Sequence, residues 1–168
     1  MKKLVYLGLI MVFITAFGCG EKKTEKKEDG FQVNRTKKEE KKEVDGNVIA
    51  LSSNDLMQFD KSELRVKAGK TVTLTLRHTG KMEKVVMGHN FVLLAEGTDL
   101  GDFAAKAAVA RETEYIPESD AIIAYTKLIG GGETTTISFE PPAVGTYDYV
   151  CSFPGHYGIM QGKFIVEP

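Results

Sequence analysis

Three side chains able to bind a soft metal ion lie close together near the end of the chain. Cys151, His156 and Met160 fall within ten residues of sequence, and Pro154 and Gly155 place them on a turn. Strand-like sequence stands on both sides of this turn, so one sheet can hold the three side chains toward a single point. A thiolate, an imidazole and a weak thioether are ligands of a blue copper centre, which needs a second histidine from elsewhere in the chain.

His89 is the best candidate for that second imidazole. The chain contains only three histidines, which are His78, His89 and His156. A glycine marks the entry to a predicted strand in the run that contains His89, which reads Met87-Gly88-His89-Asn90-Phe91-Val92. Two histidines in two glycine-bounded loops, one of them close to a cysteine, favour metal ligands, and we interpret His78 as structural.

Together, the two segments resemble the copper-binding segments of the azurin family, which are small blue copper proteins with a cupredoxin fold. The shared motifs are Gly88-His89-Asn90, then Cys151-Ser152-Phe153-Pro154-Gly155-His156, and Met160. Two further stretches are azurin-like, namely Asn54-Asp55-Leu56-Met57-Gln58-Phe59 and Tyr125-Thr126-Lys127-Leu128-Ile129-Gly130. The resemblance covers roughly Val48 to Val166.

The resemblance implies a complete set of copper ligands. His89, Cys151 and His156 would be the strong ligands, with Met160 as a long axial ligand and the carbonyl of Gly88 as a weak fifth contact. It implies one copper ion that cycles between Cu(I) and Cu(II). On composition alone, an inert buried thiol and a methionine that fills the core remain alternatives for two of these side chains.

The same resemblance implies supporting residues around the ligands. Asn90 would bond to the segment at Ser152 and tie the two loops together, and the backbone amides of Asn90 and Phe153 would donate to the thiolate. The alternative for Asn90 is an ordinary turn residue. A docking patch of Met87, Tyr157 and Ile159 would surround the histidine that reaches the surface, although several of these side chains could be buried instead.

The predicted fold is all-β, a cupredoxin-like Greek-key sandwich or barrel with one short helix. Short β-rich runs separated by turn residues favour an antiparallel sandwich. The predicted strands are 48–51, 63–66, 71–78, 90–94, 121–126, 134–139, 146–150 and 163–166. The exception is Asp102–Glu112, whose alanine-rich composition favours a helix within a connection between strands.

The chain is predicted to have three parts. Residues 1–18 resemble a lipoprotein signal peptide that ends before Cys19, and the apolar run is shorter than the roughly 20 residues that span a bilayer. Residues 19–45 would be a lipidated cysteine with a charged tether, either disordered or helical. Residues 46–168 would be the copper domain. A short membrane anchor at the start, and a disulfide between the two cysteines, are the alternatives.

These features predict an electron carrier in the bacterial periplasm or cell envelope, membrane-anchored through Cys19, with c-type cytochromes as transient partners. The net charge of −1, without a basic aromatic patch, argues against nucleic acid. No enzymatic activity or small-molecule substrate is expected, because the ligand set leaves no open position and one further histidine cannot build a second copper site. A periplasmic copper carrier or buffer is the alternative function, and a metal-free adhesion lipoprotein is a further one.

Overall fold

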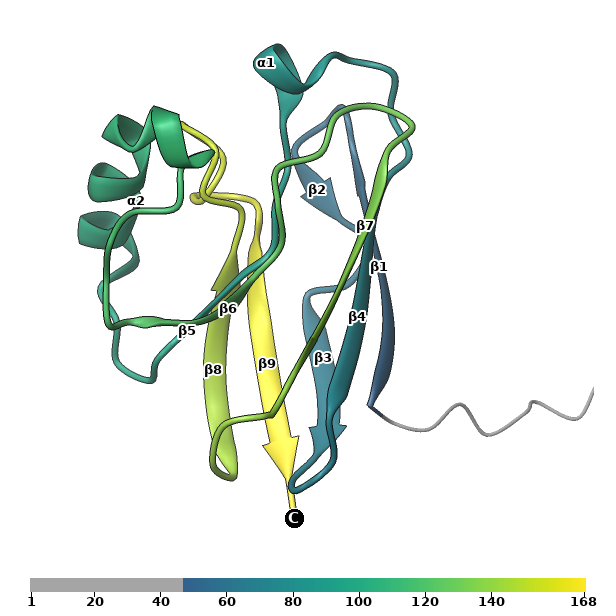
Figure 1. The fold of residues 1–168 in the computed structure, drawn as a ribbon, viewed down its shortest axis with the longest axis vertical. Helices are drawn as coiled ribbons and strands as arrows, with labels where there is room; N and C mark the ends of the chain where they lie inside the picture. The colour runs from purple at the N-terminus through teal and green to yellow at the C-terminus, as the bar shows by residue number, and fades with distance from the viewer. Residues whose placement is uncertain (1–46) are drawn as a thin grey trace, which may run out of the picture. The chain divides into compact units, whose positions relative to one another are not determined.

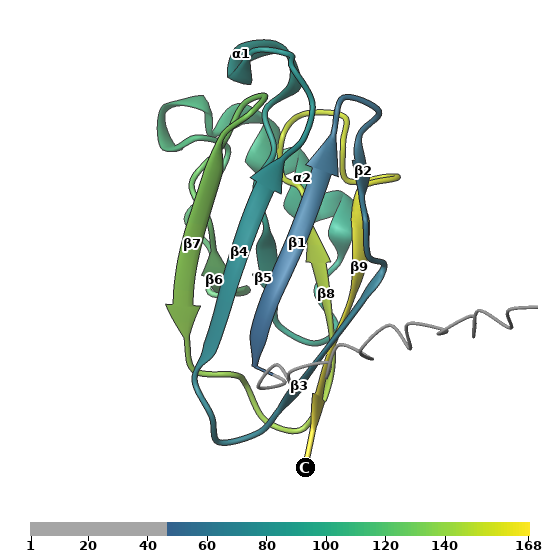
Figure 2. The same cartoon turned by 90° about the vertical axis from the view of Figure 1, so that its right-hand side faces the viewer.

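The computed structural model describes residues 47–168, which form two β-sheets packed face to face (Figures 1 and 2). The predicted signal peptide and tether lie outside the described residues, and so does Cys19. The predicted all-β sandwich is confirmed. Each predicted strand is present, with ends shifted by up to three residues.

The first sheet has four strands in the order β2-β1-β4-β7. Their bounds are Gln58–Phe59 for β2, Val48–Asn54 for β1, Val72–His78 for β4 and Thr134–Phe139 for β7. In β4, Val72, Leu74 and Leu76 are fully buried while the residues between them face outward. This period of two is the alternation that the sequence showed.

The second sheet has five strands in the order β3-β9-β8-β5-β6. Their bounds are Glu63–Lys67 for β3, Gln161–Glu167 for β9, Gly145–Val150 for β8, Val92–Leu94 for β5 and Ile122–Tyr125 for β6. The segment between β8 and β9 carries the Cys-His-Met motif, so this hairpin holds that segment at one end of the sandwich.

Two pairs of strands in this mainly antiparallel sandwich are parallel. β1 pairs with β4 in parallel, and β3 pairs with β9 in parallel. The physical reason is the crossover, because the chain leaves the first sheet after β2, builds β3 in the second sheet, and returns to the first as β4. A strand that returns after such an excursion can run in the same direction as the one it left.

The predicted helix is confirmed as α2, Leu100–Val109, in the long connection between β5 and β6. Asp99 caps its start by accepting a hydrogen bond from the Asp102 amide at 2.9 Å. Phe103 and Ala107, four residues apart, are its buried face and pack on the second sheet. A 3₁₀ turn, η1 at Arg111–Thr113, completes the segment that was predicted as helix to residue 112.

Two elements were not predicted. They are strand β2 and the four-residue helix α1, Lys84–Met87, which stands at the same end of the sandwich as the β8–β9 turn (Figures 1 and 2). The helix leads directly into the predicted ligand loop at Gly88 and His89. The inner faces of both sheets form the main core, with Phe91, Tyr149 and Phe164 among its largest fully buried side chains.

Candidate metal centre

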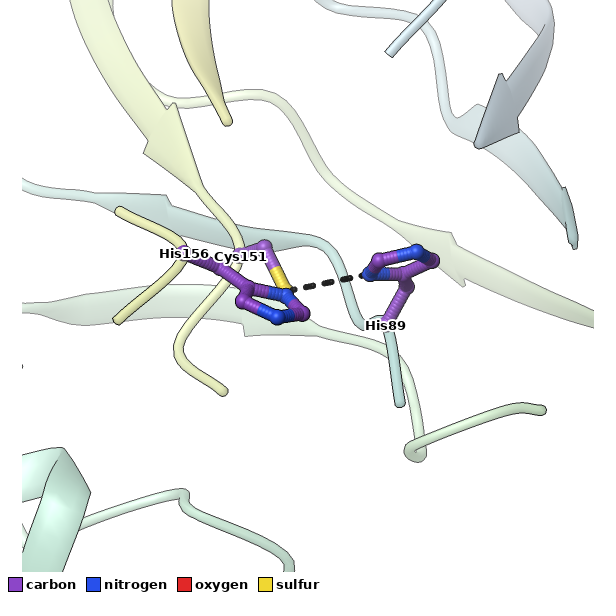
Figure 3. Close-up of side chains that lie close together, drawn as sticks. All are labelled: His89, Cys151 and His156. Carbon is purple, nitrogen blue, oxygen red and sulfur yellow. Dashed lines mark hydrogen bonds between the residues drawn. The ribbon is translucent and has the colours of Figure 1, made fainter. Parts of the chain in front are cut away.

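His89, Cys151 and His156 converge at one end of the sandwich, from two segments far apart in sequence (Figure 3). The Cys151 Sγ lies 3.8 Å from the His89 Nδ1 and 3.6 Å from the His156 Nδ1. The three donor atoms lie within 4.8 Å of one another, and all three residues are buried. The structure therefore brings together the thiol and both imidazoles that the sequence singled out.

A hydrogen bond to the backbone fixes the orientation of the His89 ring. The His89 Nε2 lies 2.8 Å from the carbonyl oxygen of Asn54, the last residue of β1. Because a carbonyl only accepts, Nε2 carries the proton and Nδ1 keeps its lone pair directed at Cys151. The sequence showed Asn54 only as part of a family-like stretch, with no role of its own.

His78 packs against the other side of His89. The two rings are stacked with their centroids 4.4 Å apart. The Gly80 amide donates to His78 Nδ1 at 3.0 Å, so the protonated Nε2 donates to the Met87 carbonyl, also at 3.0 Å. The interpretation of His78 as structural agrees with these contacts, which hold the backbone that leads into the His89 loop.

The turn that carries Cys151 is closed by its own backbone. The Cys151 amide donates to the Met160 carbonyl at 2.9 Å, which extends the β8–β9 pairing by one residue. Within the turn, the His156 amide donates to the Phe153 carbonyl and the His156 carbonyl accepts from the Met160 amide. These bonds bend the chain back so that the Cys151 thiol faces the imidazole of His156 within the turn.

Asn90 joins the two loops, as predicted. Its side-chain Nδ2 donates to the Ser152 Oγ, and its Oδ1 accepts from the Ser152 amide, both at 2.8 Å. Both residues are buried, so the pair is shielded from competing water. The bidentate contact keeps the His89 loop and the Cys151 loop at a fixed separation.

Gly88 occupies a position where no side chain fits. A Cβ built on it would lie 2.6 Å from the Lys84 carbonyl oxygen and 2.8 Å from a methyl carbon of Leu128. The absence of a side chain lets the backbone approach the site, and the Gly88 carbonyl oxygen lies 3.9 Å from the Cys151 Sγ.

Burial sets the charge state of the three donors. Desolvation lowers the pKa of His89 and of His156 to about 4, so both imidazoles are neutral at pH 7. Desolvation raises the pKa of the Cys151 thiol to about 12, while the amides of Asn90 and Phe153 act in the opposite direction. The two predicted amide donors are thus in place, and a bound cation would displace the thiol proton.

The donor set fits a single type 1 copper site. Metal–ligand bonds of about 2.0–2.3 Å place neighbouring donors about 3.5–4 Å apart, which matches the two sulfur–nitrogen separations. One thiolate with two neutral imidazoles is the strong part of a blue copper ligand set. Within the described residues Cys151 is a free cysteine, in keeping with a ligand role.

The remaining predicted residues divide by exposure. Met160 is fully buried, and Ile159 is 63 % exposed. Met87 and Tyr157 are half-buried, and Tyr157 packs against the α2 cluster. The exposed apolar surface near the site instead includes Leu56, Met82, Val85 and Val86, which together with Ile159 we call the apolar rim. The adjacent residues Val85 and Val86 were the sequence signal that could have indicated this surface.

A β-sandwich that closes a buried His-Cys-His cluster at one end defines a cupredoxin-type copper protein. The sequence comparison agrees, because the family model for copper-binding proteins of the plastocyanin/azurin family matches residues 44–167. The chain therefore belongs to the plastocyanin/azurin family of copper-binding proteins.

Individual relatives are similar over most of this domain. Azurin-1 of Alcaligenes xylosoxydans xylosoxydans is 42% identical over 119 residues, which is 68% of this chain and 92% of that protein. Outer membrane protein H.8 of Neisseria gonorrhoeae is 43% identical over 123 residues, 70% of this chain and 67% of that protein. The structure of reduced auracyanin from Roseiflexus castenholzii has a TM-score of 0.66 at 33% identity, covering 73% of this chain and 98% of that one.

Family membership and the cluster together define the general function. The chain is a blue copper electron-transfer protein, with copper as its cofactor, and it is not an enzyme. Its general kind of partner is another redox protein.

Proposed function

We propose that His89, Cys151, His156 and Met160 hold one copper ion, with the Gly88 carbonyl as a weak fifth contact. The observation that carries this proposal is the convergence of the two Nδ1 atoms on the Cys151 Sγ. When bound, copper supplies a one-electron couple between Cu(II) and Cu(I). The chain supplies neutral imidazoles, a buried thiol and loops that are already tied together.

Two observations support the additional ligands. Cys151 and Met160 stand opposite each other at the end of the β8–β9 hairpin, where directly opposed residues direct their side chains to the same face. The Gly88 carbonyl points at the same sulfur, and the glycine is required there sterically. Buried donors held by backbone hydrogen bonds keep one arrangement in both redox states, which lowers the reorganisation that electron transfer requires.

His156 is the proposed route for the electron. His156 is 3 % exposed, whereas His89 is 0 % exposed. Within residues 47–168 no side chain or carbonyl bonds to His156 Nε2, and no fully buried side-chain nitrogen or oxygen there lacks a partner, so this atom retains some contact with solvent. The apolar rim provides the surface on which a c-type cytochrome would dock transiently.

We further propose that Cys19 is lipidated after removal of residues 1–18, and that residues 19–45 tether the domain to the bacterial envelope. One similar protein is named outer membrane protein H.8, which supports an envelope location. Among residues 47–168, no helix has the length and hydropathy needed to cross a bilayer.

The position of the first described strand suits such a tether. β1 ends at Asn54, which contacts His89, and begins six residues earlier at Val48. At about 3.3 Å per residue, its start lies about 20 Å from the metal centre. The chain therefore enters the described domain at the end of β1 that lies away from the metal centre.

One spectrum and one fractionation test these proposals separately. The copper-loaded protein should be intensely blue and lose that colour reversibly on one-electron reduction, while replacing Met160 with leucine should change the potential and keep the colour. Cys19→Ser should move the protein from the membrane fraction to the soluble fraction without changing its spectrum. A colourless copper-loaded protein contradicts the first proposal, and unchanged fractionation contradicts the second.

A further inference from the structure

A hollow of about 150 Å³ lies beside the metal centre, between α1 and the turn η1 that follows α2. Its lining includes Lys84, Val85, Arg111, Glu114, Tyr115 and Phe153. It is smaller than the roughly 300–1,000 Å³ of sites that enclose small-molecule ligands, so its size suits a single side chain.

An aromatic contact path connects this hollow to a copper ligand. The ring of Phe153 lies 4.7 Å from the ring of His156, centroid to centroid. Tyr115 packs edge-on against Phe153 at 5.1 Å. A group bound in the hollow is therefore separated from the His156 ring by one aromatic side chain.

The charges that line the hollow leave one cation unpaired. Glu114 accepts from the Lys84 Nζ at 3.1 Å and from the Leu128 amide at 3.0 Å, so both its oxygens are engaged. Arg111 has no side-chain hydrogen bond or ion pair with any residue in 47–168. Two cations and one anion leave a net charge of +1 at this point.

The hollow is continuous with an exposed apolar surface. Val85 contributes to its wall and is 73 % exposed, and the adjacent Val86 is 59 % exposed. Both belong to α1, which also carries Lys84. A positive hollow at the margin of an apolar rim matches the arrangement of a protein–protein interface, with an apolar centre and polar groups around it.

We propose that Arg111 binds a carboxylate on the redox partner and thereby sets the orientation of the partner against the apolar rim. The proposal rests on the function proposed above and adds the chemistry of the partner, an acidic protein surface next to its redox group. The planar guanidinium can hold a carboxylate through two parallel hydrogen bonds, and this geometry fixes direction as well as position.

The test uses full-length copper-loaded protein and two reduced c-type cytochromes as probes, one with an acidic surface around the haem edge and one with a basic surface. Stopped-flow measurement gives the second-order rate of copper reduction by each. The variants are Arg111→Gln and Arg111→Glu. Arg65→Gln is the matched control, because it removes the same charge from β3, where Arg65 is exposed and pairs with Glu63 and Glu167.

With the acidic cytochrome, Arg111→Gln should lower the rate about three- to tenfold and Arg111→Glu should lower it further, whereas Arg65→Gln should change it less than twofold. With the basic cytochrome, Arg111→Glu should raise the rate. Opposite responses to the two probes cannot arise from damage to the copper site, which would slow both.

Equal effects of Arg111→Gln and Arg65→Gln overturn the proposal, as does a loss of rate with both cytochromes. If, in protein that also carries Cys19→Ser so that no acyl chain binds the bilayer, Arg111→Glu abolishes sedimentation with phosphatidylglycerol vesicles and leaves both rates unchanged, the hollow binds anionic lipid and the proposal is wrong. Failure of the proposed function is a separate result, because the wild-type protein would then lack the blue colour and reversible reduction.

Discussion

The two histidines of the metal centre lie in very different surroundings. His89 is held on every side, with Nε2 bonded to the Asn54 carbonyl, its face stacked on His78, and its backbone paired in both directions with Ile129 at 2.9 Å. His156 lies on the turn between two strands, and its ring contacts are the rings of Phe153 and His89.

This difference separates two tasks that one site must perform. The His89 side is part of the folded core and fixes where the donor atoms stand. The His156 side lies on a turn beside the half-buried Phe153, and it is the side through which we propose that the electron passes to a docked partner. A metal centre whose ligands were all held as His89 is would also be rigid, but would lack the less enclosed ligand that we propose as the route for the electron.

Replacing the Cys151 thiol should abolish the copper site, to which both histidines contribute. In Cys151→Ser the hydroxyl cannot replace a soft thiolate, so we expect complete loss of the blue absorption and a loss of copper affinity of several orders of magnitude. Absorption spectra and copper titration measure both effects. Cys19→Ser is the matched control and should remain blue, and any blue colour left in Cys151→Ser would contradict the ligand assignment.

Glycine substitution of each histidine tests the contrast directly. In His156→Gly, the gap opens to the surface, so added imidazole should enter and restore the blue absorption. In His89→Gly, the gap is enclosed by core residues, so the same concentration of imidazole should restore little or nothing. Titration with imidazole, followed by absorption, measures the restored fraction.

Equal restoration of the two variants would show that the enclosed side opens readily, contrary to the hydrogen bonds around His89. Circular dichroism of both variants is the control for folding.

The surroundings of His89 were harder to predict from the sequence than those of His156. The ligand types and their spacing in 151–160 were informative because a cysteine, a histidine and a methionine rarely fall on one glycine-containing turn by chance. The contact between Asn54 and His89 spans 35 residues and involves a backbone carbonyl, which carries no signature of residue type. It depends on the sheet that places β1 beside the His89 loop.

For the fold, the sequence likewise predicted most of the individual elements but not how they pair. Alternation in 71–78 predicted β4, and alanine-rich composition predicted α2. The parallel pairing of β1 with β4 was not predictable, because alternation fixes which face is buried but not the direction of the neighbouring strand. Helix α1 was missed because four residues are too few to show a helical period.

Acid should destabilise the copper-free protein through the same two histidines. Burial lowers their pKa values from the usual 6.5 to about 4. Between these values the unfolded chain binds more protons than the folded one, so the free energy of unfolding falls as pH decreases from 6.5 to 4. The full loss is on the order of 3 kcal/mol for each imidazole.

Thermal unfolding of the copper-free protein at pH 7, 6, 5 and 4 measures this loss. A double variant with both histidines changed to glutamine is the comparison, and its melting temperature should fall much less over the same range. A parallel fall in the two proteins would assign the acid sensitivity to other groups.

The hydrogen bonds between Asn90 and Ser152, which join the two ligand loops, should affect the free energy of unfolding less than the two histidines do. Asn90→Ala removes both bonds to Ser152 and leaves the buried amide and hydroxyl of Ser152 without their partner. We therefore expect the free energy of unfolding to fall by about 2–3 kcal/mol. Ser152→Ala removes one of the two bonds and should cost about 1 kcal/mol. Urea denaturation of the copper-free variants measures both values, and equal costs would contradict the expectation that the bond from the Ser152 amide stabilises the protein independently of the bond to its hydroxyl.

The smallest effect is expected on the exposed side, at the ion pair that holds α1. Glu114→Gln removes the charge that pairs with Lys84 but keeps a carbonyl oxygen to accept from the Leu128 amide. Because Lys84 and Glu114 are 45 % and 42 % exposed, the pair should contribute less than 1 kcal/mol to the free energy of unfolding. Glu114→Ala loses the backbone contact as well and should cost more, measured by urea denaturation. If Glu114→Gln costs as much as Glu114→Ala, the ion pair with Lys84 and not the hydrogen bond from the Leu128 amide holds α1. The structure around His156 would then be more stable than its exposed contacts indicate.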